Sequence, residues 1–228
     1  MTDRAGGAGR VPSDHSSLLI EQAHKALLER LRDGRLTSGG FLSMPMLVKQ
    51  LELPIAAVRD AVKRCEACGL LTVLPKRGVA VMDAGPEMTR ECLELRAMFD
   101  CEGARRLITQ GGSIPLDQLR SAHESLRDAA RDRLTPEMPK RAIEVDLSLH
   151  DALAAGIGGG LAGRLYAENR DRIAVIQNTR PFLPDRIVPA MDEHLAIIAA
   201  IEARDTGAAT AAIREHLSGT LRWWGIGV

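Results

Sequence analysis

Residues 145–153, VDLSLHDAL, place an aspartate and a histidine four positions apart among leucines. On a helix, side chains four residues apart share one face, so Asp146 and His150 are expected to point the same way. Two further stretches with helically spaced apolar residues each hold one more histidine: DEHLAIIAAIEA (192–203) holds His194, and REHLSGTL (214–221) holds His216. One carboxylate and three imidazoles form a donor set typical of first-row metal sites.

The apolar residues beside these four positions recur at the spacing of one helical face, so the four side chains are expected to line the inside of a helical bundle. The sequence therefore predicts a buried divalent metal ion, with Zn²⁺ as the first expectation and Ni²⁺ or Mn²⁺ as alternatives. A network of hydrogen-bonded core histidines is the competing interpretation, because a single histidine on an apolar face is more often structural than a ligand.

The composition of the 228-residue chain favours a helical protein, since 45% of the residues are hydrophobic but only 3% are aromatic. No stretch approaches the ~20 apolar residues that span a bilayer, and the first residues lack the apolar centre of a signal peptide. We therefore expect a cytoplasmic protein with no membrane partner, in which residues 1–17 form a disordered tail.

The net charge of the chain is zero, but its two parts differ. Residues 1–82 hold 12 Lys and Arg against 8 Asp and Glu, whereas residues 83–228 hold 18 against 22. The basic amino-terminal part is consistent with a nucleic-acid partner without requiring one.

The order of elements within residues 18–82 is typical of one class of DNA-binding fold. Three helices and then two short strands are expected: helices at 18–32, 46–51 and 54–67, and strands at 70–74 and 79–82. Three helices and a two-stranded wing form a winged helix-turn-helix, whose third helix enters the major groove of DNA.

Basic residues fall on the elements that such a fold presents to DNA. The candidates for phosphate or base contacts are Lys49, Arg59, Lys63, Arg64, Lys76 and Arg77. Ammonium and guanidinium groups neutralise phosphates, and an arginine can also read a guanine edge with two hydrogen bonds. The competing interpretation is a set of ordinary solvated charges.

After a linker at 83–86, residues 87–228 are expected to form an antiparallel bundle of six helices, so the whole chain is predicted to be mainly α. The helices are expected at 87–110, 115–133, 136–155, 160–179, 184–204 and 206–224. Consecutive glycines at 158–160 predict a break between the third and fourth. Asn169 and Asn178 are candidates to reach a ligand in the pocket, with a solvent-facing role as the alternative.

The run AVRDAVKRCEACGLLTVLPKRGVAV (57–81) resembles the signature of GntR-type regulators, in which a V-R-E-A-L-x-x-L-E-x-x-G-L core leads into a P-x-R-G wing. The matching residues are Val58 to Val62, then Glu66, Gly69 and Leu70, then Pro75, Arg77 and Gly78. Behind this run, LELRAMFD (93–100), Asp146 with His150, and EHLAIIAAIEARD (193–205) are similar to the helical FCD-type effector domain of the FadR subgroup. The resemblance covers nearly the whole chain from residue 18.

The resemblance implies a homodimeric transcription factor, expected to be a repressor, that binds a palindromic operator and responds to a small metabolite. It implies the same metal ligands, because the one Asp and three His of the family fall on Asp146, His150, His194 and His216. Effectors in this family are often carboxylates, and Arg96 matches a pocket-facing arginine that could pair with an acid group. The alternative partner of Arg96 is Asp100, four residues further along the same helix.

Several positions depart from the family pattern. The family usually has a Ser and an Arg where this chain has Pro54 and Ile55, and an Arg where it has Pro45, so some DNA contacts of the family are missing. Weaker DNA affinity or an unusual operator is the expected consequence. Gly160 replaces a common Asn of the effector domain, which predicts a changed edge of the pocket.

Two rival functions stay open on the sequence alone. Zinc held by histidines can activate water in a metal-dependent hydrolase, but no H-E-x-x-H pattern supplies a general base. Glu193 is a poor substitute for that base, because it lies about 100° around the helix from His194. The second rival is a direct metal-ion sensor, although ligands embedded in apolar helices fit it less well than exposed ligands would.

Overall fold

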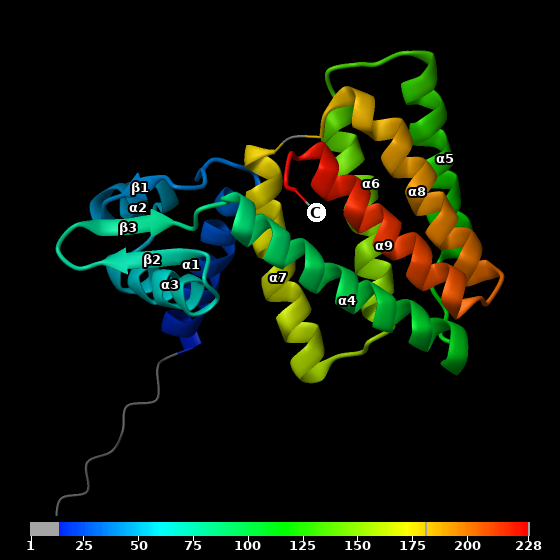
Figure 1. The fold of residues 1–228 in the computed structure, drawn as a ribbon. Coiled ribbons are helices and arrows are strands. Elements are labelled where there is room, and N and C mark those ends of the chain that lie inside the picture. The colour runs from blue at the N-terminus through cyan, green and yellow to red at the C-terminus, as the bar shows by residue number, and fades with distance from the viewer. Residues whose placement is uncertain (1–13, 181, 228) are drawn as a thin grey trace, which may run out of the picture. The chain divides into compact units, whose positions relative to one another are not determined.

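The computed structural model describes residues 14–180 and 182–227 and divides into two compact units, Met1–Met82 and Asp83–Val228. The described residues form nine helices and one three-stranded sheet (Figure 1). The fold is therefore mainly α, as the sequence predicts. Residues 1–13 of the expected tail lie outside the described residues.

The first unit has the element order of a winged helix-turn-helix, with its last two strands as the wing. The elements are α1 (Asp14–Arg32), β1 (Phe41–Leu42), α2 (Met44–Leu51), α3 (Ile55–Ala67), β2 (Leu71–Leu74) and β3 (Gly78–Val81). Helix α1 begins at Asp14, before the expected start at Leu18, so the described end of the expected tail is helical.

Local signals join α2 and α3 in a sharp turn. At the start of α2, the Ser43 hydroxyl accepts a hydrogen bond of 3.3 Å from the Met46 amide, as an N-cap serine does. At its end, Glu52 takes a left-handed conformation with φ 55°, and Pro54 then precedes α3. The buried face of α3 packs against α1, which leaves the opposite face of α3 exposed.

The sheet has the strand order β1-β3-β2, and both pairs are antiparallel. Strand β1 contains only two residues, too few to form an alternating pattern, so the sequence predicts only β2 and β3. Gly78 begins β3 with φ 135°, and a Cβ at this position would collide with the Leu42 carbonyl oxygen. Glycine is therefore required where β1 passes the base of the wing.

The described residues of the second unit form an antiparallel bundle of six helices. They are α4 (Pro86–Gln110), α5 (Leu116–Asp132), α6 (Met138–Ala155), α7 (Gly160–Thr179), α8 (Pro184–Glu202) and α9 (Thr206–Trp223). The glycines at 158–160 separate α6 from α7, as the sequence predicts. None of the described helices is both long and apolar enough to cross a membrane.

Packing in the bundle fixes the helices that carry the candidate ligands. Helix α8 contacts both α5 and α9, while α4 packs against α6, α7 and α9 (Figure 1). Helices α4 and α6 cross closely at Gly103, where a Cβ would collide with the Leu153 carbonyl oxygen. Fully buried side chains, including Leu149, Ile197 and Ile198, fill the core around them. Each such side chain contributes about 1.5–3 kcal/mol on burial, so the ligand helices are held firmly.

Candidate metal centre and DNA-binding surface

Four side chains from three helices converge at the centre of the bundle. Asp146 and His150 come from α6, His194 from α8 and His216 from α9. All four are buried, and one ligand atom of each lies within 4.8 Å of the corresponding atoms of the others. The structure thus brings together all four residues that the sequence proposes as metal ligands.

The atoms that meet at the centre are the three Nε2 nitrogens and one carboxylate oxygen. His194 Nε2 lies 3.2 Å from His216 Nε2 and 3.5 Å from Asp146 Oδ1. His150 Nε2 lies 3.8 Å from the same oxygen and has no hydrogen-bond partner among the described residues. Four donor atoms therefore face a common point.

The Nδ1 nitrogen of each of the three imidazoles, which points away from the centre, contacts a neighbouring side chain. The Nδ1–H of His150 donates to Asp100 Oδ2 over 2.8 Å, and that of His216 donates to Glu193 Oε2 over 2.8 Å. The Nδ1 of His194 lies 3.1 Å from Nε2 of a fifth histidine, His123 on α5. Because a carboxylate can only accept, the protons of neutral His150 and His216 belong on Nδ1, and their Nε2 lone pairs face the centre.

Burial and charge keep the centre in a form suited to binding a cation. Burial lowers the pKa of His194 and His216, and the neighbouring histidines lower that of His194 further. Burial and Arg96 act to lower the pKa of His150, but Asp100 raises it overall. Burial alone would raise the pKa of Asp146, yet Arg96 and the imidazoles hold it well below its usual value. The centre therefore offers one carboxylate and mainly neutral imidazoles, the forms in which these groups bind metals.

One donor pair already has the spacing of a zinc site, while the other candidate atoms lie farther apart, all within 4.8 Å of one another. Two imidazole nitrogens on one tetrahedral zinc, each at ~2.0–2.1 Å, lie roughly 3.3 Å apart. His194 Nε2 and His216 Nε2 lie 3.2 Å apart, and His150 Nε2 is buried without a partner. When both nitrogens carry lone pairs, these repel at this distance, and a shared cation would relieve the repulsion. Buried ligands with hydrogen-bonded outer partners are the usual construction of a protein metal site.

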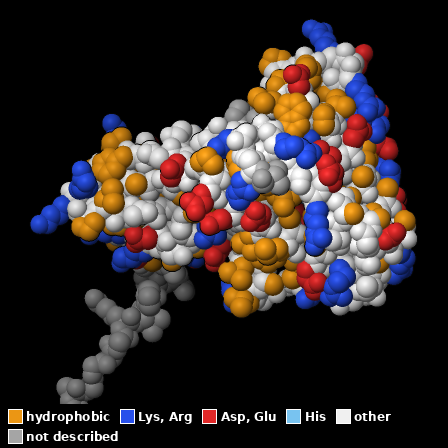
Figure 2. Space-filling view, viewed as in Figure 1, with side chains coloured by type: hydrophobic (Ala, Val, Ile, Leu, Met, Phe, Trp, Pro, Cys, Tyr) orange, Lys and Arg blue, Asp and Glu red, His pale blue; other side chains and the backbone are white. Residues whose placement is uncertain are grey.

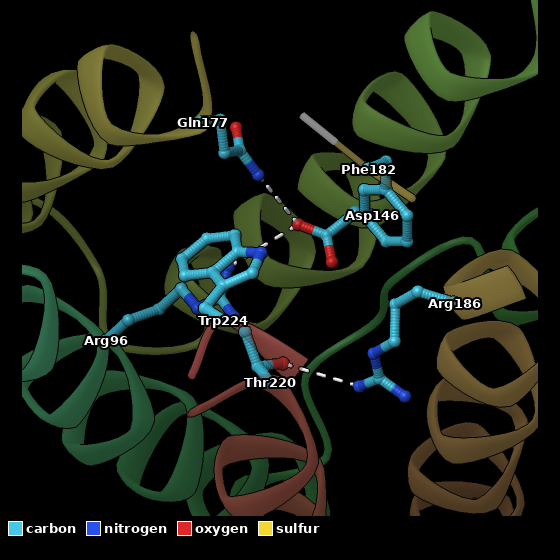
Figure 3. Close-up of a pocket in the computed structure, with 7 residues that line it drawn as sticks. All are labelled: Arg96, Asp146, Gln177, Phe182, Arg186, Thr220 and Trp224. Carbon is cyan, nitrogen blue, oxygen red and sulfur yellow. Dashed lines mark hydrogen bonds and ion pairs between the residues drawn. The ribbon is translucent and has the colours of Figure 1, made fainter. Parts of the chain in front are cut away.

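A small cavity adjoins the centre (Figure 3). Its lining residues come from several helices and from the chain between α7 and α8: Arg96, Asp146, Gln177, Phe182, Arg186, Thr220 and Trp224. The volume of about 20 Å³ suffices for about one water molecule. Figure 3 shows the Gln177 amide directed at the Asp146 carboxylate, with the Trp224 indole beside them. A larger ligand therefore needs lining side chains to move.

Two arginines line this cavity, and they differ in how closely their guanidinium groups are paired. Arg96 Nη1 lies 3.4 Å from Asp146 Oδ2, and its Nη2 lies 3.4 Å from His216 Nε2, so both contacts are long. Arg186 instead forms a close two-point ion pair with Glu193, the outer partner of His216. Asp100, the alternative partner suggested by the sequence for Arg96, accepts from His150 through Oδ2, and its Oδ1 has no hydrogen-bond partner among the described residues. Arg96 is thus the arginine with hydrogen-bonding capacity to offer an anion beside the centre.

The two asparagine candidates lie apart from the cavity lining. Asn169 is buried and donates to the Cys92 carbonyl oxygen over 2.9 Å, while Asn178 is exposed. Gln177, adjacent to Asn178, lines the cavity in their place, and its Oε1 has no partner among the described residues. The carboxyl-terminal half of α7 is mostly buried. Helical periodicity alone therefore does not predict which of two neighbouring side chains, Gln177 or Asn178, faces the cavity.

His123 contacts a candidate ligand, although the sequence pattern alone predicts no role for it. This residue is fully buried on α5 in the register of Leu119, Leu126 and Ala130, which form the apolar stripe of that helix. A histidine within an otherwise apolar stripe is the signal that could have identified it. The carboxylates that hold the other imidazoles, Asp100 and Glu193, carry no comparable signal, since acidic residues are frequent on all these helices.

The six candidate DNA-binding residues are all exposed on α2, α3 and the wing. Arg59 and Lys63 share one face of α3 with Ile55, whose exposed fraction is 46%. Arg64 instead forms an ion pair of 2.6 Å with Glu21 of α1. Figure 2 shows Lys and Arg side chains gathered at the end of this unit where the β2–β3 loop lies. The exposed candidates thus lie on the face of α3 that starts at Ile55 and on the loop at Lys76 and Arg77.

Comparisons with known proteins agree with both units. The FCD domain model matches residues 91–219. The chain is 24% identical over 222 residues to the HTH-type transcriptional regulator BphR of Paraburkholderia xenovorans, covering 94% of this chain and 88% of that protein. It is 25% identical over 185 residues to the HTH-type transcriptional repressor GlaR of Escherichia coli, covering 77% and 82%. A solved structure of a putative GntR transcriptional regulator from Rhodococcus has a TM-score of 0.69 at 19% identity, covering 95% of this chain and 100% of that one.

Proposed function

Because this chain belongs to the GntR family of transcriptional regulators that carry an FCD domain, we propose that it is a repressor whose DNA affinity is set by a small carboxylate at a metal ion. It would bind a palindromic operator as a homodimer, in the manner of the FadR subgroup. Its relatives are transcriptional regulators, so the chain is a DNA-binding regulator and not an enzyme, which removes the hydrolase alternative. The name of the relative GlaR, a repressor, supports the proposed direction of control.

One observation carries the proposal: the Nε2 atoms of three buried histidines and the Asp146 carboxylate meet beside the guanidinium of Arg96. A bound divalent ion, for which Zn²⁺ is our first choice, would supply positive charge and open coordination positions for a carboxylate. The Arg96 guanidinium would then face a second positive charge across a buried, weakly screened space. An anion that pairs with Arg96 would offset this repulsion, which favours acids over neutral metabolites.

Opening of the cavity links effector binding to the end of the bundle. The present cavity holds about one water molecule, so an organic acid requires displacement of lining side chains, among which Phe182 and Trp224 are the aromatic ones. Trp224 caps the carboxyl end of α9, and its carbonyl oxygen accepts a hydrogen bond of 2.8 Å from Arg180 next to α7. Trp224 thus lies where the carboxyl ends of α7 and α9 are joined by a hydrogen bond.

A dimer would convert this movement into a change of DNA affinity. A palindromic operator fixes the distance between two recognition helices, so a shift in their spacing weakens both half-sites together. To change the dominant state, the effector must favour the non-binding form by a few kcal/mol. Exposed apolar residues on α4 and α7, namely Met98 (67%), Leu161 (65%) and Leu165 (45%), support pairing through this face. Figure 2 shows hydrophobic side chains gathered over the amino-terminal end of α7.

The first experiment measures the metal content of the purified protein and of a His150→Ala, His194→Ala double variant. We expect about one ion per chain in the wild type and none in the variant. Thermal melts with a panel of small carboxylates should then show a rise in the Tm only for metal-loaded wild type. Absence of metal from the wild type, even after reconstitution with Zn²⁺, Ni²⁺ and Mn²⁺, would contradict the proposal.

A second experiment separates metabolite sensing from direct metal sensing. Affinity for a palindromic operator fragment is measured for the metal-free protein, the metal-loaded protein, and the metal-loaded protein with a stabilising acid. We expect the acid to weaken binding at least tenfold, which corresponds to about 1.4 kcal/mol. A change caused by the ion alone, with no further effect of any acid, would favour the direct sensor instead. Equal affinity in all three states would exclude both forms of control.

A further inference from the structure

His123 lies behind the candidate metal centre, on a helix that supplies none of the four ligands. It is fully buried on α5, and its ring meets the ring of His194 on α8 with centroids 5.1 Å apart. Its Nε2 lies 3.1 Å from His194 Nδ1, and its Nδ1 lies 2.6 Å from the Leu119 carbonyl oxygen. His123 is therefore the outer partner of His194, as Asp100 is of His150 and Glu193 is of His216.

The protons of this pair can be assigned from its neighbours. A carbonyl oxygen only accepts, so the proton of neutral His123 belongs on Nδ1, where it is donated to Leu119. The Nε2 of His123 then has a bare lone pair and accepts the Nδ1–H of His194. As a result, His194 Nε2 carries no proton and presents its lone pair to the centre.

The tautomer of His194 with its proton on Nε2 also has a hydrogen-bond partner nearby. The local geometry of His194 therefore does not by itself decide which nitrogen carries the proton. With its proton on Nε2, His194 could donate to His216 Nε2, which lies 3.2 Å away. That hydrogen bond would use the lone pairs of two candidate ligands at once and oppose metal binding. The outer partner of His194 decides between the two arrangements.

We propose that His123 is a positioning residue of the metal centre, which holds His194 in the tautomer that leaves Nε2 free for the ion. This inference rests on the metal-binding function proposed above. It also gives α5 a direct connection to the ion, through the carbonyl of Leu119, His123 and His194. Loss of the acceptor nitrogen of His123 should therefore weaken metal binding. It should also reduce the stabilisation of α5 that metal binding produces.

Three substitutions separate this role from simple packing. His123→Gln places an amide oxygen near the position of Nε2 and can still accept from His194. His123→Asn reaches only the position of Nδ1, so it keeps the bond to Leu119 but loses the bond to His194. His123→Leu keeps much of the volume and loses both bonds. A role in holding Leu119 would rank Asn at least equal to Gln, and a role in filling the core would rank Leu at least equal to Gln.

The measurement is the Zn²⁺ affinity of the full chain in competition with a chromophoric chelator. We expect wild type and His123→Gln to agree within a few-fold, and His123→Asn and His123→Leu to bind about 10-fold more weakly or worse. The Tm of each metal-free variant checks its folding. Equal affinity of wild type and the Asn variant, or equal losses in the Gln and Asn variants, would overturn the role of His123. Failure of the wild type to bind any ion would instead overturn the metal centre, and this inference with it.

Two readouts test the tautomer and the connection to α5 directly. In metal-free protein with ¹⁵N-labelled histidine, the shifts of His194 should place its proton on Nδ1 in the wild type and on Nε2 in the Asn variant. Hydrogen exchange in α5 should slow on addition of Zn²⁺ to the wild type and change less in the Asn variant. A proton on Nε2 of His194 in the metal-free wild type would contradict the assignment without reference to metal affinity.

Discussion

At the scale of single residues, Arg96 and the ligand cluster have opposing electrostatic requirements. The guanidinium stabilises the charged form of Asp146, whose pKa is held low by this contact despite burial. The same guanidinium lies 3.4 Å from His216 Nε2, close to the point where a cation would bind. Arg96 should therefore favour the effector and disfavour the ion.

Arg96→Met separates these two effects. We expect the Zn²⁺ affinity to stay equal or to rise, because a positive charge beside the ion is removed. The affinity for the stabilising carboxylate should fall 10-fold or more, since a hydrogen bond to a charged group contributes about 1.5–3 kcal/mol. Calorimetric titration of metal-loaded protein measures both quantities. Arg96→Lys, which keeps the charge but loses the planar fork, should be intermediate, and loss of zinc from the Met variant would assign Arg96 to the metal instead.

The buried histidines predict how the metal-free protein responds to acid. Burial lowers the pKa of His123, His194 and His216 relative to the unfolded chain, so the unfolded state binds more protons below about pH 6.5. Their contribution to stability is complete above that pH and is lost as the pH falls. The raised pKa of His150 opposes this trend but is a single group.

We therefore expect the free energy of unfolding of the chelator-treated protein to fall between about pH 7 and pH 5. Urea unfolding at several pH values measures it, with a slope of at most about 1.4 kcal/mol per pH unit for each group. Replacement of His194 by Gln should make the slope shallower, because one of the groups with a lowered pKa is removed. A stability that rises toward pH 5 would mean that the ion pair of His150 with Asp100 dominates.

Spacing predicts the four ligands because they repeat the register of apolar stripes on three helices. It does not predict which side chains hold them, since Asp100, Glu193 and His123 come from elements that meet only in the fold. Nor does it distinguish Gln177 from Asn178, because one step around a helix moves a side chain from cavity to solvent.

At the scale of elements, breaks in the helical pattern made most boundaries predictable. The glycines at 158–160 mark the boundary between α6 and α7, and prolines mark the first residues of α4 and α8. A periodic apolar pattern alone does not locate these helix boundaries. The pairing of β1 with β3 could not be predicted, since a two-residue strand is defined by its partner and not by its own sequence. The start of α1 at Asp14 could not be predicted either, because the residues before Leu18 carry no continuous apolar stripe.

Helix α3 gives a prediction about DNA at this scale. Ile55 occupies the exposed start of the face that continues through Arg59 and Lys63, where the family commonly has an arginine. Ile55→Arg should raise the affinity for DNA and make the slope of log K against log salt steeper by about one unit, because one more phosphate is neutralised. Fluorescence anisotropy at several salt concentrations measures both. Exposed Leu134 of the second unit offers a control, Leu134→Arg, that tests whether any added charge has the same effect. An unchanged salt slope for the Ile55 variant would place this end of α3 away from the phosphates.

At the scale of the whole molecule, all four candidate metal ligands come from one chain, so metal binding and pairing of chains can be tested separately. The Phe99 ring meets the Tyr166 ring edge-on at 5.8 Å, so α4 and α7 pack together, and each of these helices also carries exposed apolar residues. A second copy of the chain would bury this face, and a symmetric operator requires two copies.

A double substitution in this face tests the dimer without touching the centre. Leu161→Glu with Leu165→Glu should give a monomer by sedimentation, because charges would have to be buried against their own copies in a symmetric interface. Operator affinity should fall more than 100-fold, while Zn²⁺ content and stabilisation by the carboxylate persist. Leu134→Glu is a matched control, since Leu134 and Leu165 are each 45% exposed but only Leu165 lies on α7. A double variant that remains dimeric would move the interface elsewhere on the chain. A monomer that binds the operator with unchanged affinity would exclude control through the spacing of two recognition helices, since that mechanism requires both half-sites to be held by one particle.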